Sequence, residues 1–421
     1  MINTLLTLLN KHKEVSDYEV SITQTKSSQL FYILDKLETN RITNNKDIYV
    51  TVYHDFEEYR GSSNFILNAA DDEQTIEAKI HLAINTAKKV KNPKFELVNP
   101  SDEKMVEVES IKTDNLNSVA IKCADAIMSA NHYREGWINS VEIFVTNKSN
   151  RFINSKGVDL YFEKNSLEVE IIPTWKGENE EIELYLDFKT IELDYEDIKN
   201  RTDRILKEAK LRAEAQNISE EMPNVPVVMS GDMLKMLMWN LVDDVSYNNV
   251  YIKSNHYNKG DQIVDYPLDL KLLPYYKGAV SSAPYDGSGI VLKEYQVMEN
   301  GMFINYWGDN RFGQYLGIKN ISGVMNVLKV STKNTIDDIL PSLEILNFSS
   351  PQLDSSTGYF GGEVRLGIYK DINGNVTPVT GFSVSGNIYE AIKEAKYSKE
   401  EIVLTSYVGP KSIFFPNLKI N

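Results

Sequence analysis

Side chains suited to bind a transition metal are scarce in this chain. It has one cysteine, Cys123, and its histidines are His12, His54, His81, His132 and His256. Zinc sites usually show some short, regular ligand spacing, because one element then supplies two ligands. No two of these histidines stand within helical or strand spacing of each other. The sequence therefore predicts no metal site, and His81 is expected on the solvent face of a helix.

Other reactive side chains lack a catalytic arrangement. Cys123 belongs to an apolar pattern typical of a buried helix face: Leu116, Val119, Ala120, Cys123 and Ile127. We expect it to be a core residue rather than a nucleophile. The acidic run at residues 178–183 indicates the solvent edge of a strand, since its carboxylates have no common focus. Serine and lysine are plentiful, but no nucleophile elbow or Ser-x-x-Lys motif stands in a convincing context.

The composition excludes some classes of function. The chain has 421 residues, 42% of them hydrophobic, and a net charge of -15. This length predicts two or three domains, and the negative charge disfavours nucleic-acid binding through a broad basic surface. The apolar run at residues 5–9 is too short for a membrane span and lacks the flanks of a signal peptide. We expect a cytoplasmic protein without a nucleic-acid or membrane partner.

The elements predict an α+β fold, with a mixed α/β N-terminal region before a β-rich C-terminal domain. Strands are expected at residues 18–22 and 48–52, a serine-rich loop at 61–63, and helices at 72–91, 116–127 and 195–215. Strands that dominate the second half, such as 377–384 and 413–420, predict antiparallel or barrel-like sheets. Residues 217–226, with two prolines, form the best linker. The domains are therefore predicted as 1–220 and 221–421, and a further division of the first at residue 105 stays open.

The most distinctive stretch is residues 285–317. A turn at Asp286-Gly287-Ser288-Gly289 precedes a strand at 291–298, and Asn300-Gly301 separates it from a second strand at 302–307. Asn-Gly between two apolar runs predicts a hairpin, because both central residues need positive φ. A short helix opens at Gly308. Earlier in the chain, a buried strand at 225–230 leads into a strongly apolar helix at 233–245.

These stretches resemble the TldD/PmbA proteins, a family also named as modulators of DNA gyrase and as peptidase family U62. Residues 285–289 match an aromatic-Asp-x-Glu-Gly motif, in which Ser288 replaces the glutamate. Residues 154–158 resemble the family's Asn-Ser-x-Gly turn, and 381–388 and 415–420 match two later segments. Each motif alone is weak, but their order covers nearly the whole chain.

The resemblance also implies where catalysis would take place. Catalytic members carry His-Glu-x-x-x-His on the helix matched here by residues 233–245, where two imidazoles bind zinc and the glutamate activates water. In this chain Trp239, Asn240 and Asp244 occupy these three positions. Tryptophan offers no lone pair, asparagine no basic oxygen, and one carboxylate makes no site. Residues 408–412 also lack the cysteine that catalytic members place there.

The resemblance therefore implies a zinc-less, PmbA/TldE-like member without catalytic residues or a cofactor of its own. Such a chain would be the non-catalytic subunit of a TldD/TldE-type metallopeptidase complex, with zinc in a TldD-like partner and a peptide as substrate. The strand-rich second half could hold an extended peptide by edge pairing. Two alternatives stay open: a stand-alone, peptide-binding homodimer descended from the peptidase, and a peptidase of unrecognised mechanism. The peptide-binding residues are not identified by the sequence.

Overall fold

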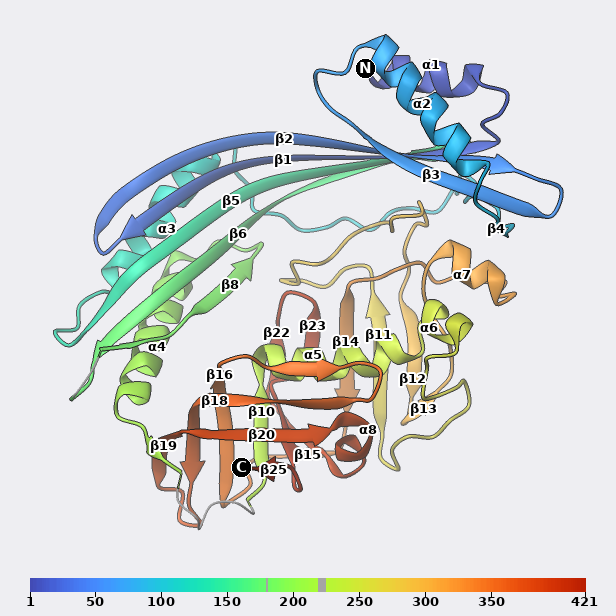
Figure 1. The fold of residues 1–421 in the computed structure, drawn as a ribbon. Coiled ribbons are helices and arrows are strands. Elements are labelled where there is room, and N and C mark those ends of the chain that lie inside the picture. The colour runs from blue at the N-terminus through green and yellow to red at the C-terminus, as the bar shows by residue number, and fades with distance from the viewer. Residues whose placement is uncertain (179–180, 219–224) are drawn as a thin grey trace.

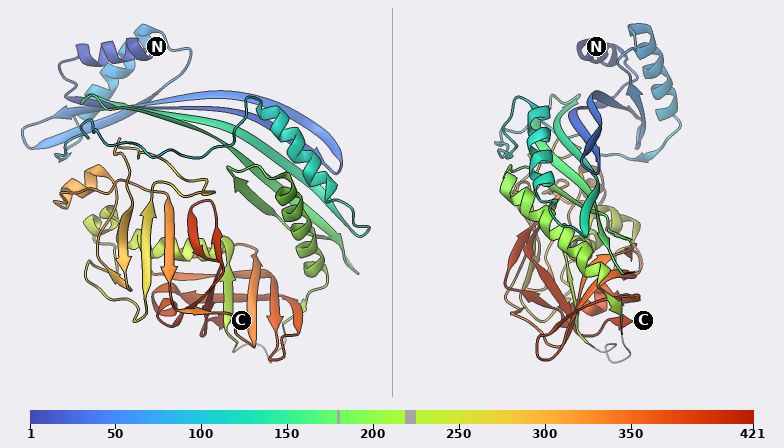
Figure 2. Two further views of the ribbon diagram at one scale, coloured as in Figure 1. Left: turned by 180° about the vertical axis from the view of Figure 1, so that it is seen from behind. Right: turned by 90° about the vertical axis from the view of Figure 1, so that its left-hand side faces the viewer.

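The computed structural model describes residues 1–178, 181–218 and 225–421 (Figure 1). An arched sheet from the first half of the chain covers a second half that contains two further sheets (Figures 1 and 2). None of the described helices has the length and apolar character that crossing a membrane requires.

The arched sheet is antiparallel throughout and has the strand order β4-β3-β2-β1-β5-β6-β7, with β8 also paired to β6. Its strands are β1 (Asp17–Ile33), β2 (Lys36–Asp55), β3 (Tyr59–Leu67), β4 (Asn92–Pro93), β5 (Gly136–Asn154), β6 (Asp159–Lys176), β7 (Glu181–Glu183) and β8 (Leu186–Thr190). The strands predicted at 18–22 and 48–52 are thus parts of much longer ones. The serine-rich loop predicted at residues 61–63 is wrong, because these residues lie within β3. Gly61 lets a helix pack closely there, since a Cβ would approach the Ala87 carbonyl oxygen to 1.9 Å.

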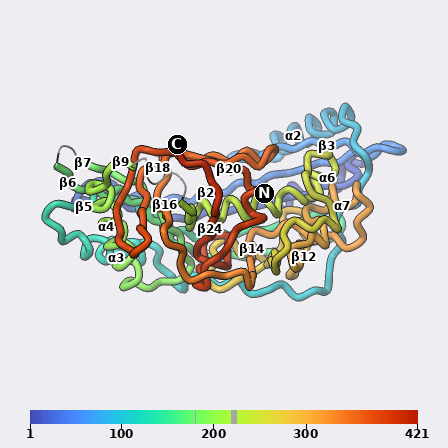
Figure 3. The backbone as a smooth tube through the Cα atoms, turned by 90° about the horizontal axis from the view of Figure 1, so that it is seen from below, coloured from blue at the N-terminus to red at the C-terminus, as the bar shows by residue number. Residues whose placement is uncertain are grey.

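One face of this sheet carries two pairs of helices at opposite ends (Figures 1 and 3). They are α1 (Ile2–Lys11) with α2 (Glu73–Ala87), and α3 (Leu116–Ser129) with α4 (Tyr195–Ala213). Val20 and Ile22 of β1 pack with α1 and α2, whereas Leu30 packs with α3 and α4. These three side chains share a face because alternate residues of a strand point the same way. Cys123 of α3 is fully buried as predicted, and burial raises the pKa of its thiol to about 12.

The second half of the chain forms an eleven-stranded and a six-stranded sheet. The larger sheet contains β9 (Gln216–Asn217), β10 (Val227–Ser230), β15 (Thr335–Ile336), β16 (Ser342–Phe348), β17 (Gln352–Asp354), β18 (Tyr359–Lys370), β19 (Val376–Thr380), β20 (Phe382–Asn387), β21 (Lys396–Ser398), β24 (Ser412–Phe415) and β25 (Lys419–Ile420). The smaller contains β11 (Leu268–Leu273), β12 (Tyr295–Glu299), β13 (Met302–Phe303), β14 (Val327–Thr332), β22 (Glu401–Val403) and β23 (Tyr407–Pro410). The helices here are α5 (Gly231–Asp244), α6 (Tyr247–Ile252), α7 (Asn310–Tyr315), α8 (Ile388–Ala391) and the 3₁₀ helix η1 (Ile392–Glu394).

Helix α5 forms the centre of the second half (Figure 1). Leu234, Leu237 and Leu241 of this helix belong to one apolar core with side chains of both sheets, among them Leu343 and Leu270. This core explains why the sequence of α5 is apolar on several faces: a helix between two sheets must bury more than one stripe.

The α+β class is confirmed, with two differences in the second half. Four strand pairs there are parallel: β10 with β16, β14 with β23, β15 with β21, and β9 with β19. In the described part of the chain no sheet closes into a barrel. The strand predicted at 377–384 is divided by Gly381, whose φ of 76° is unsuited to a strand. The hairpin between β12 and β13 is confirmed, with φ of 47° at Asn300 and 80° at Gly301.

The two halves meet at the underside of the arched sheet (Figure 2). The Tyr285 hydroxyl donates to the carbonyl oxygens of Asn150 and Leu160, at 2.8 and 3.2 Å. Nζ of Lys164 on β6 donates to the carbonyls of residues 280 and 282. The predicted boundary between residues 220 and 221 falls outside the described residues. That boundary and the division at residue 105 stay predictions.

Candidate functional site

Helix α5 presents the three motif positions in two directions. Asn240 and Asp244 are four residues apart and lie on one buried face, while Trp239 lies on the face of Asp243. Helix α5 begins directly after β10, at Gly231, whose φ is 60°. The three side chains therefore do not converge on one point where an ion could be held.

Asp244, which the resemblance matches to the second histidine of the motif, has a carboxylate saturated by hydrogen bonds. Oδ1 accepts the backbone N–H of His256 at 2.9 Å, and Oδ2 accepts that of Tyr257 at 2.9 Å. Oδ1 also lies 3.0 Å from Nδ1 of His256 and 3.3 Å from the hydroxyl oxygen of Tyr389. The side chain of Asp244 is only 2% exposed. These contacts make Asp244 a structural acceptor that fixes the chain at residues 256–257.

Asn240 replaces the glutamate, and it bonds to the same tyrosine. Its Nδ2 lies 3.3 Å from the Tyr389 hydroxyl, which can donate its own proton to Asp244 or to the Ser355 carbonyl. Burial, and then the nearby Asp244 carboxylate, raise the pKa of Tyr389 well above its usual value. The phenol thus stays protonated and donates, so Asn240 is a neutral amide in a hydrogen-bond network that also includes the Asp244 carboxylate.

Trp239, which the resemblance matches to the first histidine of the motif, packs against the C-terminal strands. Its Nε1 donates to the Ser406 carbonyl at 3.1 Å, and its ring lies 6.1 Å from that of Trp307. Ser406 directly precedes β23. This strand contains the start of residues 408–412, the segment that lacks the cysteine expected from the resemblance. No group of Cys, His, Asp or Glu among the described residues could hold a metal at this helix.

Two adjoining hollows lie beside α5. The first, of about 590 Å³, is lined by Trp239, Asp243, Ser281, Trp307, Val324, Met325, Asn326 and Ser406. The second, of about 250 Å³, reaches the underside of β5 and β6, where its lining includes Lys148 and Lys164. Both share Ser281 and Asn326, so together they form one groove between the halves of the chain.

Two groups along this groove have shifted pKa values. Asp243 is exposed on its outer side, yet the protein around it displaces water and raises its pKa to about 6. Burial, and then the charge of Lys148, lower the pKa of Lys164 to about 8. Neither Asp243 nor Lys164 was predicted from the sequence to belong to a site. The groove that they share is formed by segments distant in the sequence, so no regular spacing of residues could reveal it.

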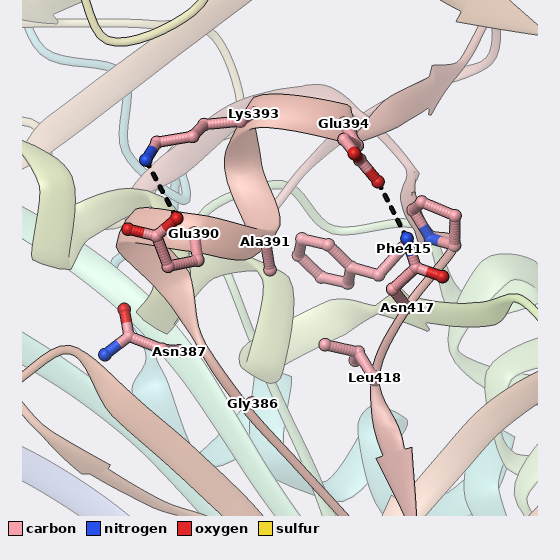
Figure 4. A pocket seen from close by; sticks show the side chains of 10 residues that line it. Gly386, Asn387, Glu390, Ala391, Lys393, Glu394, Phe415, Asn417 and Leu418 are labelled. Carbon is pink, nitrogen blue, oxygen red and sulfur yellow. Dashed lines mark hydrogen bonds and ion pairs between the residues drawn. The ribbon is translucent and has the colours of Figure 1, made fainter.

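A third hollow, of about 280 Å³, lies between α8, η1 and the C-terminal segment (Figure 4). Figure 4 shows Glu390 paired with Lys393, and Glu394 accepting from Asn417. Its described lining contains none of the three motif positions. Asn387 at its edge caps α8 by accepting from the Tyr389 N–H.

The family-shaped turn at residues 285–289 is structural. The buried Asp286 carboxylate accepts the N–H groups of Ser288, Ile290 and Val324 at 2.9–3.0 Å. Burial raises its pKa although these bonds lower it. Ser288, in the place of the family's glutamate, contributes only its N–H group to this turn among the hydrogen bonds of the described residues.

Comparison with known proteins shows the lineage. Residues 223–421 match the model of the PmbA/TldA metallopeptidase C-terminal domain. TldE from Thermococcus kodakarensis superimposes with a TM-score of 0.81 at 14% identity, covering 100% of this chain and 99% of that one. Residues 223–421 therefore match the C-terminal domain of the PmbA/TldA metallopeptidases, and the whole chain has the fold of TldE.

Two further structures of similar fold are described as candidate modulators of DNA gyrase. The one from Thermotoga maritima has 16% identity, a TM-score of 0.81 and 100% coverage of both chains. The one from Bacteroides thetaiotaomicron has 14% identity and the same TM-score, and covers 100% of this chain and 97% of that one. At such identity these structures establish that the TldD/PmbA fold is shared. No curated protein sequence matches the chain.

Proposed function

We propose that this chain is the zinc-less subunit of a TldD/TldE-type metallopeptidase complex, in which a TldD-like partner supplies the zinc. The observation that carries the proposal is the state of the three motif positions on α5. Trp239, Asn240 and Asp244 each bond to another group of this chain, and none is free to hold an ion or activate water. A site that had merely lost one ligand would leave the others pointing at an empty centre. Here the replacements form a hydrogen-bonded structural cluster.

The groove beside α5 supports a role in holding peptide. It combines apolar walls, such as Trp239 and Trp307, with charged groups at separate places, Asp243 in one hollow and Lys148 and Lys164 in the other. Pockets that recognise extended ligands commonly pair apolar walls with a few polar anchors. We assign the peptide to this groove, where its carboxylates would lie near the lysines. Replacing Ser281, which lines both hollows, by arginine should obstruct the groove and weaken peptide binding.

The hairpin of β1 and β2 offers a surface for the partner subunit. At its turn, Ile33, Leu34 and Leu37 have 56%, 47% and 43% of their surface open to solvent. Further along β2, opposite Ser28, Ile42 is 76% exposed. Several exposed apolar side chains on one element are typical of a surface that contacts another protein. We therefore expect the hairpin to contribute to dimer formation, whether with the TldD-like chain or with a second copy.

The experiment that tests the proposal mixes this chain with a TldD-like chain encoded in the same genome. Light scattering after size-exclusion chromatography should show a heterodimer, and Ile42→Asp should weaken it at least tenfold while Asn45→Asp does not. A chain that forms only a homodimer, and binds peptide alone, would favour the stand-alone binding protein instead. The proposal includes the cytoplasmic location expected from the sequence.

A further inference from the structure

A second group of metal-binding side chains lies at the far end of the molecule from α5. His12 follows the last residue of α1, while Glu77 and His81 stand four residues apart on one face of α2. The two histidine rings meet edge to face with centroids 4.7 Å apart. His81 lies on the solvent-exposed side of α2, as the sequence predicts, yet its ring contacts that of His12. The packing of α1 on α2 joins residues that are distant in sequence.

The distances between the donor atoms suit one small ion. Nε2 of His12 lies 3.0 Å from Oε1 of Glu77, and Nε2 of His81 lies 3.7 Å from the same oxygen. One donor atom from each of the three residues lies within 4.8 Å of the others. In a tetrahedral zinc site, bonds of about 2.0–2.1 Å place donor atoms about 3.3 Å apart. The measured separations of 3.0 and 3.7 Å lie on either side of that value.

The orientation of these groups argues against a simple ion pair. Nε2 of His12 is buried, and despite its 3.0 Å approach to Glu77 it has no hydrogen bond of acceptable geometry within the described residues. Oε2 of Glu77 is likewise buried without a partner in that part of the chain. Buried polar atoms are rarely left in this state. A cation between the three side chains would satisfy the donor atoms that the protein itself does not.

The surroundings make the site both rigid and accessible. Leu5, Leu8 and Leu9 of α1 pack against Ile76 and Ile80 of α2 in a single apolar core. That core fixes the helices before any ion binds, so little ordering is required of the ligands. The side chains of His12, Glu77 and His81 are 13%, 28% and 57% exposed, which leaves a side open to solvent.

We propose that His12, Glu77 and His81 bind a zinc ion that ties the end of α1 to α2. Two imidazoles and one carboxylate suit Zn²⁺, whereas Mg²⁺ and Ca²⁺ prefer oxygen ligands alone. The open side leaves a fourth position for water. This site departs from the expectation that the chain has no metal of its own. It lies apart from the motif positions on α5, and its test does not depend on peptidase activity.

The test is calorimetric titration of the full, metal-free chain with Zn²⁺. We expect one ion per chain with micromolar or tighter affinity, and visible absorption bands of tetrahedral Co²⁺ when cobalt replaces zinc. His12→Ala and His81→Ala should each weaken zinc binding at least tenfold. His132→Ala, which removes an exposed histidine outside the site, should leave it unchanged.

A thermal readout guards against misfolded variants. Zinc should raise the melting temperature of the wild-type chain and of His132→Ala, but not that of His81→Ala. Because His81 is largely exposed, its variant should unfold like the wild type when no metal is present. Absence of stoichiometric zinc binding would overturn the proposal. Equal binding by the wild type and both ligand variants would overturn it too, since the ion would then lie elsewhere.

Discussion

His256 and Asp244 face each other across 3.0 Å, from Nδ1 to Oδ1. A carboxylate can only accept, so Nδ1 of His256 carries the proton in this bond. The N–H groups of residues 256 and 257 add two more bonds to the same carboxylate. Asp244 is therefore an anchor for the segment that follows α6.

Replacing Asp244 should therefore destabilise the fold rather than change a reaction. Asp244→Ala removes the acceptor of several partly buried donors, and we expect a loss of roughly 2–4 kcal/mol in the free energy of unfolding. Asp243→Ala is the matched control. The carboxylate of Asp243, next to Asp244 in the sequence, has no hydrogen bond to the described residues. Asp243→Ala should not lower stability, because it breaks no hydrogen bond and removes a charge that burial disfavours. Urea denaturation measures both, and equal effects would contradict the anchoring role.

Glu19 gives the fold a dependence on pH. Burial raises the pKa of this carboxyl to about 7, although the Tyr53 hydroxyl donates to it at 2.6 Å. The folded chain then binds a proton that the unfolded chain has released, between the usual value of 4.5 and about 7. In that window the free energy of unfolding contributed by Glu19 falls as pH rises.

Glu19→Gln should remove this loss. From pH 5 to pH 8, the free energy of unfolding of the variant should rise relative to that of the wild type by on the order of 1 kcal/mol. This value is reduced for the partial exposure of the side chain. The exposed Glu57→Gln serves as control and should follow the wild type at both pH values. Parallel stability curves for Glu19→Gln and the wild type would show that Glu19 does not hold its proton in the fold.

The hairpin that marks the family depends on Gly301. Its φ is 80°, and a Cβ there would lie 2.4 Å from the Val264 carbonyl oxygen. Gly301→Ala should therefore cost roughly 2–3 kcal/mol of stability. A Cβ at Gly287 would meet nothing within 4 Å, so Gly287→Ala is the control. If both variants melt together, the turn is not the constraint that we infer.

Cys123 should report on unfolding. Its thiol is fully buried and its pKa is raised to about 12, so little thiolate is present or accessible near neutral pH. We expect iodoacetamide to label the native chain at least a hundredfold more slowly than the unfolded chain. Mass spectrometry after a timed exposure gives the ratio. Rapid labelling under native conditions would mean that α3 opens readily.

Local chemistry explains which parts of the fold were predictable. Asn300-Gly301 specifies its own turn, and Asp72 caps α2 by accepting the Thr75 N–H, as the start of the predicted helix requires. The full length of β1 and β2 was not predictable, because Lys36 to Lys46 is polar and mostly exposed and has no buried face to create a pattern.

The candidate site, too, was predictable from the sequence only in part. The family motif places Trp239, Asn240 and Asp244 on one helix, but nothing in the sequence pairs Asp244 with Tyr389, which lies 145 residues away. Likewise, the spacing of Glu77 and His81 suits one helix face, whereas His12 joins them only through the packing of α1 on α2. Contacts of this kind arise from the tertiary fold.

The most direct test of the subunit assignment is a peptide-cleavage assay with and without a TldD-like partner. The chain alone, supplied with Zn²⁺, should leave an unstructured peptide intact, even if zinc occupies His12, Glu77 and His81. Adding the TldD-like chain should start cleavage, and mutating the partner's zinc motif should stop it. Cleavage by this chain alone, after removal of metal, would contradict the account.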